Sequence, residues 1–200
     1  MKVIRNKVRE EKKAQVPTRL ITYDKSEIAG LVERAVSGDF EAFGELYSIY
    51  LDRIYRYVFY QVRDKMTAEG ITEEVFVKAW KAIGSCKGKE STFSSWLYRI
   101  AHNHVIDNLR SLQKHPSIEI EAVDKVGNLE LEMEGEQERQ ELLGVIACLP
   151  QSQRQVIILK FIEGLDNREI GQVMGKSEGA IRALQMRALA ALREKLGGEQ

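Results

Sequence analysis

Apolar residues recur at three- and four-residue steps along most of the chain, which is the spacing of one face of an α-helix. The pattern is clearest in residues 40–64, whose apolar positions share one side of a helix: Phe43, Leu46, Tyr47, Tyr50, Ile54, Tyr57 and Val58. The same periodicity predicts helices over residues 27–38, 71–83 and 92–113. Strand-like alternation is rare, so we expect an all-α fold.

Capping residues indicate where several of these helices begin and end. Ser26 and Asp39 each precede a periodic segment, and their side chains can accept hydrogen bonds from the first free backbone N–H groups of a helix. In the C-terminal part, Pro150 suits the first turn of a helix that Gly164 ends. The remaining signals there are a capping box at Asp166 and Glu169, a C-terminal cap at Gly175 and an N-terminal cap at Ser177.

Composition divides the chain into four parts. Residues 114–143 contain nine Asp and Glu and three Lys and Arg, a net charge of −6, although the whole chain has a formal net charge of zero. Some of this segment alternates like a strand, but its charge density and its Pro and Gly favour a flexible linker. We therefore expect a basic, disordered extension (1–25), a helical domain (26–113), an acidic linker (114–136) and a second helical domain (137–197). Contact of the extension with DNA or a partner is the alternative.

The composition argues against several classes of protein. An apolar run long enough to cross a membrane is absent, and the basic start is not followed by the apolar stretch of a secretory signal, so we expect a cytoplasmic protein without membrane insertion. Cys86 and Cys148 lack the spacing of metal ligands, and we expect two buried thiols without a disulfide. His102 and His104 point in different directions on a helix. We expect no enzymatic activity, metal, cofactor or small-molecule substrate.

The last two helices are joined only by Gly175, Lys176 and Ser177, a connection typical of helix-turn-helix domains that place the second helix in the major groove of DNA. One face of the last helix is apolar, and the opposite face combines small residues, which permit close approach to bases, with arginines that bind guanines or phosphates. The candidate DNA-contacting residues are Ser177, Gly179, Arg182, Ala183, Met186 and Arg187. An ordinary amphipathic helix with solvated arginines is the alternative.

Two segments resemble one family of proteins. LPQSQRQVIILKFIEGLDNREIGQVMGKSEGAIRALQMRALAALREKL resembles region four of bacterial sigma factors, although regulators of the LuxR type share this layout. FEAFGELYSIYLDRIYRYVFYQV, ITEEVFVKAWKAI and FSSWLYRIAHNHVIDNLR resemble region two of the same family, in the same order. Only the short acidic segment separates the two regions, which points to the extracytoplasmic-function group. The resemblance implies two small helical domains, a region 2 bundle and a region 4 helix-turn-helix, joined by a flexible acidic linker.

The helix over residues 92–113 carries a polar stripe about 100° or more from its apolar stripe. This polar stripe contains Trp96, Arg99, Asn103, Asp107 and Arg110. Tryptophan can stack on bases while its polar neighbours hydrogen-bond to their edges. The resemblance implies that this helix, with Lys87 and Lys89 in the loop before it, reads the downstream promoter element and holds a flipped base. The alternatives are a core position for Trp96 and an intrahelical pair between Asp107 and Arg110.

The helix over residues 71–83 has outward positions of another kind. They are Glu73, Glu74, Val77, Lys78 and Lys81. A valine among exposed charges suits docking to a protein, and the resemblance implies the clamp of the largest polymerase subunit; a solvated charged face is the alternative. Two positions depart from the family pattern. Gly70 stands where an acidic residue is usual and Gly171 stands where alanine is usual, and we expect neither to abolish the fold.

The resemblance implies a complete mode of action. The chain would bind the clamp and the flap of core RNA polymerase, recognise two elements of promoter DNA and assist DNA melting, with the linker near the RNA exit path. An anti-sigma protein would hold the free factor. The rival hypotheses are a helix-turn-helix regulator that acts without core polymerase, an interaction module without promoter activity, and a histidine-based enzyme.

Overall fold

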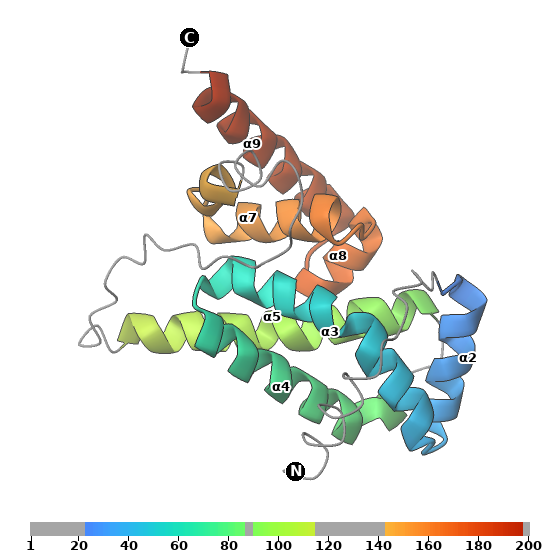
Figure 1. Ribbon diagram of the computed structural model, residues 1–200. Coiled ribbons are helices and arrows are strands. Elements are labelled where there is room, and N and C mark those ends of the chain that lie inside the picture. The colour runs from blue at the N-terminus through green and yellow to red at the C-terminus, as the bar shows by residue number, and fades with distance from the viewer. Residues whose placement is uncertain (1–22, 87–89, 115–142, 198–200) are drawn as a thin grey trace, which may run out of the picture.

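The computed structural model describes residues 23–86, 90–114 and 143–197, and within these ranges every regular element is a helix (Figure 1). The expectations for the disordered extension, for Lys87 and Lys89, and for most of the acidic linker lie outside the described residues. The helices form two groups that follow each other along the chain. The N-terminal module contains α2 to α5, and the C-terminal module contains the short helix of residues 143–147 and α7 to α9.

The N-terminal module is a bundle of four α-helices. They are α2 (Lys25–Val36), α3 (Phe40–Val62), α4 (Lys65–Ala82) and α5 (Glu90–Lys114), and the 3₁₀-helix η1 (Ile83–Ser85) follows α4. Helix α3 packs against α2, α4 and α5. Aromatic side chains fill much of the core: Tyr50, Tyr57, Phe93 and Tyr98 are each at most 2% exposed. The apolar positions predicted from periodicity on α3 are buried, except for Tyr47, which is 36% exposed.

Two predicted helix starts in this module are wrong. Asp24, not Ser26, caps α2: its carboxylate accepts from the backbone of Ser26 and Glu27, and Glu27 Oε2 accepts from Asp24 N at 2.7 Å. Helix α4 begins at Lys65 instead of Ile71, because Asp64 accepts from Thr67 N at 2.7 Å. The first turns of α4 were missed because residues 65–70 lack the three- and four-residue spacing of apolar side chains. Asp39, in contrast, caps α3 as predicted.

The C-terminal module contains α7 (Gln151–Ile157), the π-helical segment η2 (Ile158–Ile162), α8 (Asn167–Met174) and α9 (Glu178–Gly197). Pro150 precedes α7 at the N-cap instead of lying in its first turn. The predicted capping box is present, with Asp166 and Glu169 exchanging hydrogen bonds of 2.8 Å, and Gly175 ends α8 at a φ of +63°. Helix η2 was not predicted; its wider turn precedes Glu163, whose N–H donates to Ile158 O at 3.0 Å.

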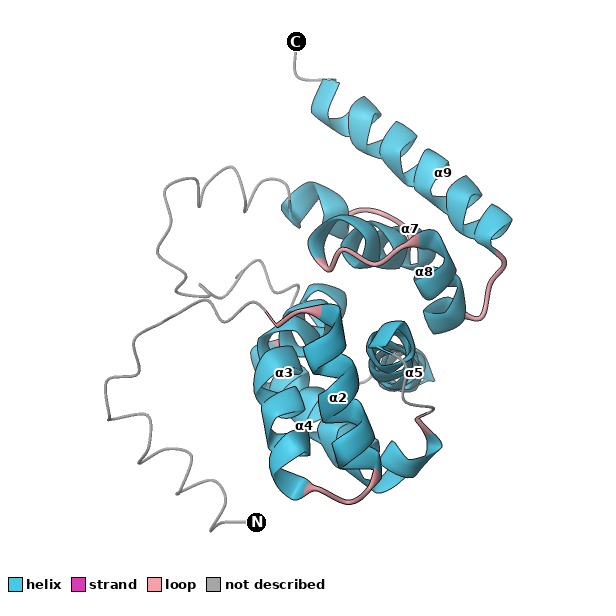
Figure 2. Ribbon diagram, turned by 90° about the vertical axis from the view of Figure 1, so that its right-hand side faces the viewer, coloured by secondary structure: helices cyan, strands magenta, loops and turns pink. Residues whose placement is uncertain are grey.

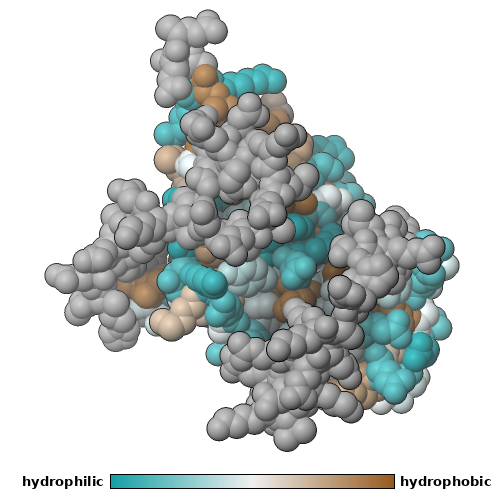
Figure 3. Space-filling model, viewed as in Figure 1, coloured by the Kyte–Doolittle hydropathy of each residue, from teal (hydrophilic) through white to brown (hydrophobic). Residues whose placement is uncertain are grey.

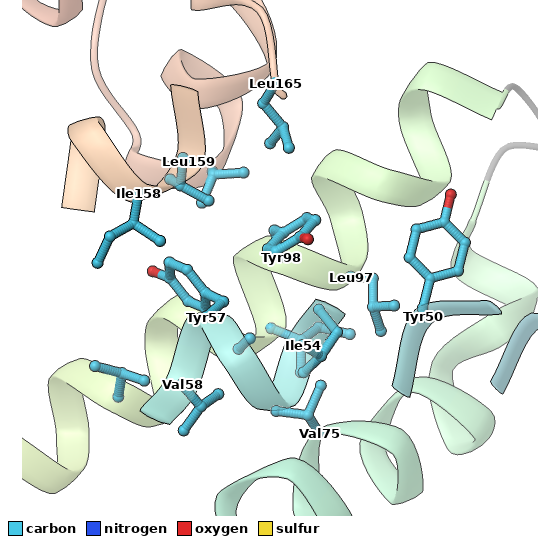
Figure 4. Packing of buried hydrophobic residues seen from close by; sticks show 14 of the residues in the cluster. Tyr50, Ile54, Tyr57, Val58, Val75, Leu97, Tyr98, Ile158, Leu159 and Leu165 are labelled. Atoms are coloured by element: carbon cyan, nitrogen blue, oxygen red, sulfur yellow. The ribbon is translucent and has the colours of Figure 1, made fainter. Parts of the chain in front are cut away.

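The two modules pack against each other. Helix α8 packs against α5, and α7 and η2 contact α3. In the turned view α5 is seen end-on and α8 runs across it (Figure 2). Ile158, Leu159 and Leu165 of the C-terminal module face Tyr57 and Tyr98 of the N-terminal module (Figure 4). All five of these side chains are at most 3% exposed. The buried residues of both modules therefore form one continuous cluster.

The surface is mixed in polarity. On the face shown in Figure 3, hydrophilic side chains of the described residues alternate with small apolar patches, one of them near the end of α9.

Cys148 is exposed, contrary to the prediction, while Cys86 is buried as expected. Among the described residues, no helix has the length and apolar composition needed to cross a bilayer.

Candidate nucleic-acid and polymerase interfaces

The turn between α8 and α9 is compact and well defined. Gly175 adopts a left-handed conformation, and Lys176 N donates to Gly171 O at 3.0 Å, which closes the end of α8. Ser177 Oγ then accepts from Ala180 N at 3.3 Å, as expected of an N-cap. A side-chain bond that the sequence did not indicate joins the two helices, from Gln185 Nε2 to Asn167 Oδ1 at 2.9 Å. The orientation of α9 is thus fixed by backbone and side-chain bonds together.

The structure explains why glycine occupies position 171, which the sequence alone did not. A Cβ atom at this position would lie 2.7 Å from the carbonyl oxygen of Lys176, which is closer than real Cβ atoms come. The family's usual alanine would therefore push the turn away from α8. Gly70, the other departure from the family pattern, has open space around it and would accommodate a side chain.

Helix α9 presents its predicted DNA-reading face outward. Ile181, Ala188 and Leu192 are buried and anchor the helix. The predicted residues Ser177, Gly179, Arg182, Met186 and Arg187 are exposed, and Ala183 is half-buried. Arg182 approaches Glu178 on the same helix at 3.4 Å, but its side chain remains 67% exposed. Ala180, which a helical wheel places on the apolar side beside Ile181, is exposed instead.

Helix α5 presents a second outward stripe. Arg99, Asn103, Asp107 and Arg110 are exposed. Trp96 is half-buried and its ring centroid lies 5.9 Å from that of Phe93, so part of the indole packs on the core and part remains accessible. The alternative pairing of Asp107 with Arg110 is present, but at 4.0 Å between side chains more than 70% exposed. Such a pair is weak and leaves Arg110 available for another partner.

A third face of α5 is covered by the C-terminal module, which the sequence did not predict. Ser95 Oγ donates to Gln172 Oε1 of α8 at 2.9 Å, and Tyr98 Oη donates to Glu163 Oε2 at 2.6 Å. Tyr57 Oη lies 3.4 Å from His102 Nδ1. Burial, together with the positive charge of Lys176, lowers the pKa of His102. His102 is therefore neutral at pH 7 and belongs to this contact.

Helix α4 carries the predicted polymerase-contacting face. Glu73, Glu74, Lys78 and Lys81 are exposed, and Val77 is 37% exposed among them. A close contact joins this face to α5, where Glu74 Oε2 lies 3.2 Å from Nδ1 of His104. His104 and His102 therefore have different partners and do not converge, and no group of three metal-ligating side chains occurs among the described residues.

Comparisons with known proteins identify the family. Residues 46–115 match Sigma-70 region 2, and residues 139–192 match Sigma-70, region 4. The extracytoplasmic-function (ECF) RNA polymerase sigma factor SigW of Bacillus subtilis is 30% identical over 184 residues, which cover 82% of this chain and 94% of SigW. The chain belongs to the ECF group of sigma factors. The chain contains region 2 as well as region 4. This distinguishes it from regulators that share only the helix-turn-helix.

Other relatives agree with this assignment. The ECF sigma-E factor of Escherichia coli K12 is 31% identical over 178 residues, which cover 83% of this chain and 92% of that factor. The ECF sigma factor BldN of Streptomyces coelicolor is 37% identical over 175 residues; the match covers 84% of this chain but 66% of BldN. The chain therefore spans about two thirds of the length of that relative.

Solved structures share the fold. CnrH, solved in complex with the cytosolic domain of CnrY, superposes with a TM-score of 0.67 at 23% identity, covering 86% of this chain and 98% of CnrH. The sigma factor RpoE of Bartonella quintana, in complex with the anti-sigma factor NepR, gives a TM-score of 0.63 at 22% identity, with coverages of 79% and 98%. Both likenesses confirm the arrangement of two helical domains.

Proposed function

We propose that this sigma factor binds core RNA polymerase and directs it to promoters, where its two modules contact separate DNA elements. The observation that carries the proposal is that α5 and α9 each bury one side in their module and keep the predicted DNA-contacting residues at the surface. Two such helices on one chain suit two-point recognition of a promoter. The proposed domain limits follow the four parts defined from the sequence.

In this proposal α9 reads the upstream element in the major groove. Arg182 and Arg187 are long enough to reach guanines or phosphates, while Gly179 and Ala183 allow the helix to come close to the base edges. Met186, 73% exposed, offers an apolar contact of the kind that thymine methyl groups accept. Ser177 lies at the N-terminus of the helix, where its hydroxyl is near the first backbone N–H groups.

Helix α5 reads the downstream element and supports DNA opening. The accessible part of Trp96 provides a stacking surface for an unpaired base, and Arg99 and Asn103 lie close by in the sequence to bind its polar edges. Lys87 and Lys89 would contact phosphates from the loop before α5. Asp107 and Arg110 extend the same stripe toward the end of the helix.

Core polymerase binds at two places. Glu73, Glu74, Val77, Lys78 and Lys81 on α4 face the clamp of the largest subunit. For the flap of the second-largest subunit, the C-terminal module offers an apolar cavity of about 500 Å³ lined by residues that include Phe161, Leu189 and Leu192. Phe161 is 60% exposed there, as expected of a docking residue.

The proposal extends to location and regulation. We infer that the protein acts in the cytoplasm, has no catalytic activity of its own and is held by an anti-sigma factor when it is not bound to polymerase. One related structure, RpoE of Bartonella quintana, contains an anti-sigma factor. The alternative, a helix-turn-helix regulator that acts without polymerase, is not favoured, because the chain matches region 2 as well as region 4.

Run-off transcription with purified core polymerase tests the proposal. We expect the full chain to co-purify with core enzyme and to start transcripts at defined sites, whose sequencing reveals the promoter elements. A chain that binds promoter DNA but neither core enzyme nor a start site would contradict the proposal and favour the regulator.

A further inference from the structure

One face of the N-terminal module combines carboxylates with accessible aromatic and apolar side chains. It lies along the contact between α3 and α4, where Tyr47 packs on Phe76 with ring centroids 4.7 Å apart. Met66 is 80% exposed on this face and Tyr47 is 36% exposed. On α4 the residues of the face follow one another at three- and four-residue steps, so they share one side of the helix. We call it the acidic face and define it by Tyr47, Asp52, Tyr55, Met66, Glu69 and Glu73.

The two tyrosines of the acidic face report how close its carboxylates are. Burial, together with the negative charges of Glu73 and Asp52, raises the pKa of Tyr47. Burial and the charge of Glu69 also raise the pKa of Tyr55. Carboxylates from α3 and from α4 therefore act on the same aromatic surface.

The carboxylates of the acidic face lack a counter-charge. Asp52, Glu69 and Glu73 are exposed, and none of them forms a salt bridge with another residue in the described part of the chain. Glu45, nearer the start of α3, does approach a cation, with Arg34 at 3.9 Å. Like charges at short distance repel each other, so a cationic occupant would relieve the repulsion. The exposed Tyr47 and Met66 suit an occupant that carries apolar side chains as well.

The chain itself contains a segment of this chemistry. Residues 1–22, which lie outside the described residues, contain seven Lys and Arg and two Glu, a net charge of +5. Apolar side chains stand among these cations, as at Val3, Ile4 and Val8. The segment therefore matches both the charge and the apolar character of the acidic face. Duplex DNA would satisfy only the charge of the segment.

The segment also starts at the right level of the module. It joins the described structure just before Asp24, the N-cap of α2. Helices α2 and α3 pack against each other and are joined by three residues, so the start of α2 lies level with the middle of α3, which carries Asp52 (Figure 1). Twenty-two residues can span roughly 70 Å, whereas Tyr47 and Tyr55 are about 12 Å apart along α3. Reach is therefore not limiting.

Tethering makes such a contact effective although each ion pair is weak. An exposed pair adds little by itself. A segment held on the same chain, however, has an effective concentration on the order of millimolar at a nearby surface. A contact that would be negligible between separate molecules is thus populated within one chain, and salt displaces it easily.

We propose that residues 1–22 bind the acidic face of their own chain. Their Lys and Arg side chains pair with the three exposed carboxylates, and their apolar side chains cover Tyr47. The acidic face shares Glu73 with the polymerase-contacting face of α4, so the bound segment competes with the clamp of polymerase. The docking stands on the described residues, whereas the competition rests on the proposed function.

Zero-length cross-linking of the full chain tests the docking. A carbodiimide joins a lysine amine to a carboxylate only where the two groups meet, and mass spectrometry identifies the linked pair. We expect links from Lys2, Lys7, Lys12 or Lys13 to the carboxylates of the acidic face. In about 1 M salt, where the Debye length is about 3 Å, most of these links should disappear. Mixing ¹⁵N-labelled with unlabelled chains separates links within one chain from links between chains. Mostly mixed links would overturn the proposal.

Two double variants make the cross-linking specific. Asp52→Asn with Glu69→Gln should reduce the links to Glu73 severalfold, because the segment loses two of its three carboxylate partners. Glu33→Gln with Glu194→Gln removes the same charge from exposed positions of α2 and α9 and should leave the links unchanged. Circular dichroism of both variants should match the parent. Links spread evenly over the exposed carboxylates of both modules, or links to Glu73 that ignore the first variant, would refute the docking.

Binding to core polymerase tests the competition. Lys12→Glu with Lys13→Glu in the full chain should bind core enzyme about twofold to threefold more tightly at low salt, because fewer molecules have the face blocked. Lys12→Arg with Lys13→Arg keeps the charge and should keep the parent affinity. Weaker core binding on charge reversal would show that the segment assists polymerase. Weaker promoter binding without links to the acidic face would show that DNA is its partner. Either result would overturn the proposal.

The docking and the proposed function fail in different ways. If the links form as expected but the chain neither binds core enzyme nor starts transcripts, the docking stands and the proposed function is wrong. If the chain starts transcripts with core enzyme while the links are absent, the proposed function stands and the docking is wrong.

Discussion

Two glutamate–arginine pairs, Glu178 with Arg182 and Glu163 with Arg56, consist of the same kinds of side chain but differ in burial and in separation along the chain. Glu178 and Arg182 are four positions apart on α9, 3.4 Å apart in space, and 47% and 67% exposed. Glu163 is fully buried and binds Arg56, which lies 107 positions earlier in the chain. The first pair belongs to one helix, and the second joins the two modules.

The difference shows where electrostatics matters in this fold. An exposed pair along a helix is screened by water and adds little to stability. A buried carboxylate held by two arginines and a tyrosine contributes little net energy to the packed arrangement of the modules, but losing one partner is costly. The buried pair therefore contributes to the specific arrangement of the modules, together with the apolar contacts around it, and a graded series of substitutions can separate the roles of the two pairs.

The largest effect is expected from Tyr98→Phe, which removes the hydroxyl that donates to Glu163 at 2.6 Å. Hydrogen bonds to charged groups contribute about 1.5–3 kcal/mol, so the free energy that holds the modules together should fall by this amount. Hydrogen exchange of the α8 amides, which lie against α5 in the packed arrangement, measures it. Tyr57→Phe is the control, because the hydroxyl of Tyr57 makes a longer contact of 3.4 Å with neutral His102. Equal protection of α8 in both variants would contradict the role given to Tyr98.

Gly171→Ala should have the next largest effect, and this effect comes from packing instead of charge. The new Cβ would lie 2.7 Å from Lys176 O, and overpacking of this kind costs about 1–3 kcal/mol. Urea denaturation should show a lower free energy of unfolding. Gly70→Ala in α4 is the matched control: it meets open space and should stabilise the protein by about 0.5–1 kcal/mol. Changes of the same sign in both variants would refute the close approach at Gly171.

The sequence predicted the features that depend on neighbours along the chain. The capping box of Asp166 and Glu169 and the left-handed Gly175 could be found because their partners are a few residues away. The start of α4 was missed because residues 65–70 lack the three- and four-residue apolar spacing of a helix face. Met66 in this segment is 80% exposed. Asp64, which caps this helix, was the signal that could have corrected it.

The contact between the modules could not be predicted in the same way. Glu163 stands in the EGL segment that reads as the end of a helix, and nothing near it indicates partners on α3 and α5. Tyr98 lies outside the polar stripe predicted on α5, and an aromatic residue beside that stripe was the only local hint of a third contact face. Such long-range pairs follow from the packing of whole modules and leave no local pattern.

Arg182→Ala tests an exposed arginine that gains its main partner only when the protein binds DNA. If Arg182 reads a base, affinity for the upstream element should fall by about 1–3 kcal/mol; if it binds phosphate, the salt dependence of binding should decrease. Fluorescence anisotropy of promoter DNA with holoenzyme, measured at several salt concentrations, distinguishes base reading from phosphate binding. Arg193→Ala serves as the control, because Arg193 is also exposed and lies eleven positions further along α9. Unchanged affinity and unchanged salt dependence would remove Arg182 from the interface.

The smallest effect is expected from Glu178→Gln, the counterpart of a change at Glu163. Exposed pairs four residues apart on a helix contribute about 0.3–0.5 kcal/mol, so the free energy of unfolding should barely change. The distance between the modules should not change at all, since both members of this pair lie on α9. Freed from Glu178, Arg182 should bind promoter DNA slightly more tightly at low salt, because a competing carboxylate is gone. A loss of stability as large as that from Tyr98→Phe would show that exposure does not separate the two pairs, and the contrast drawn between them would fail.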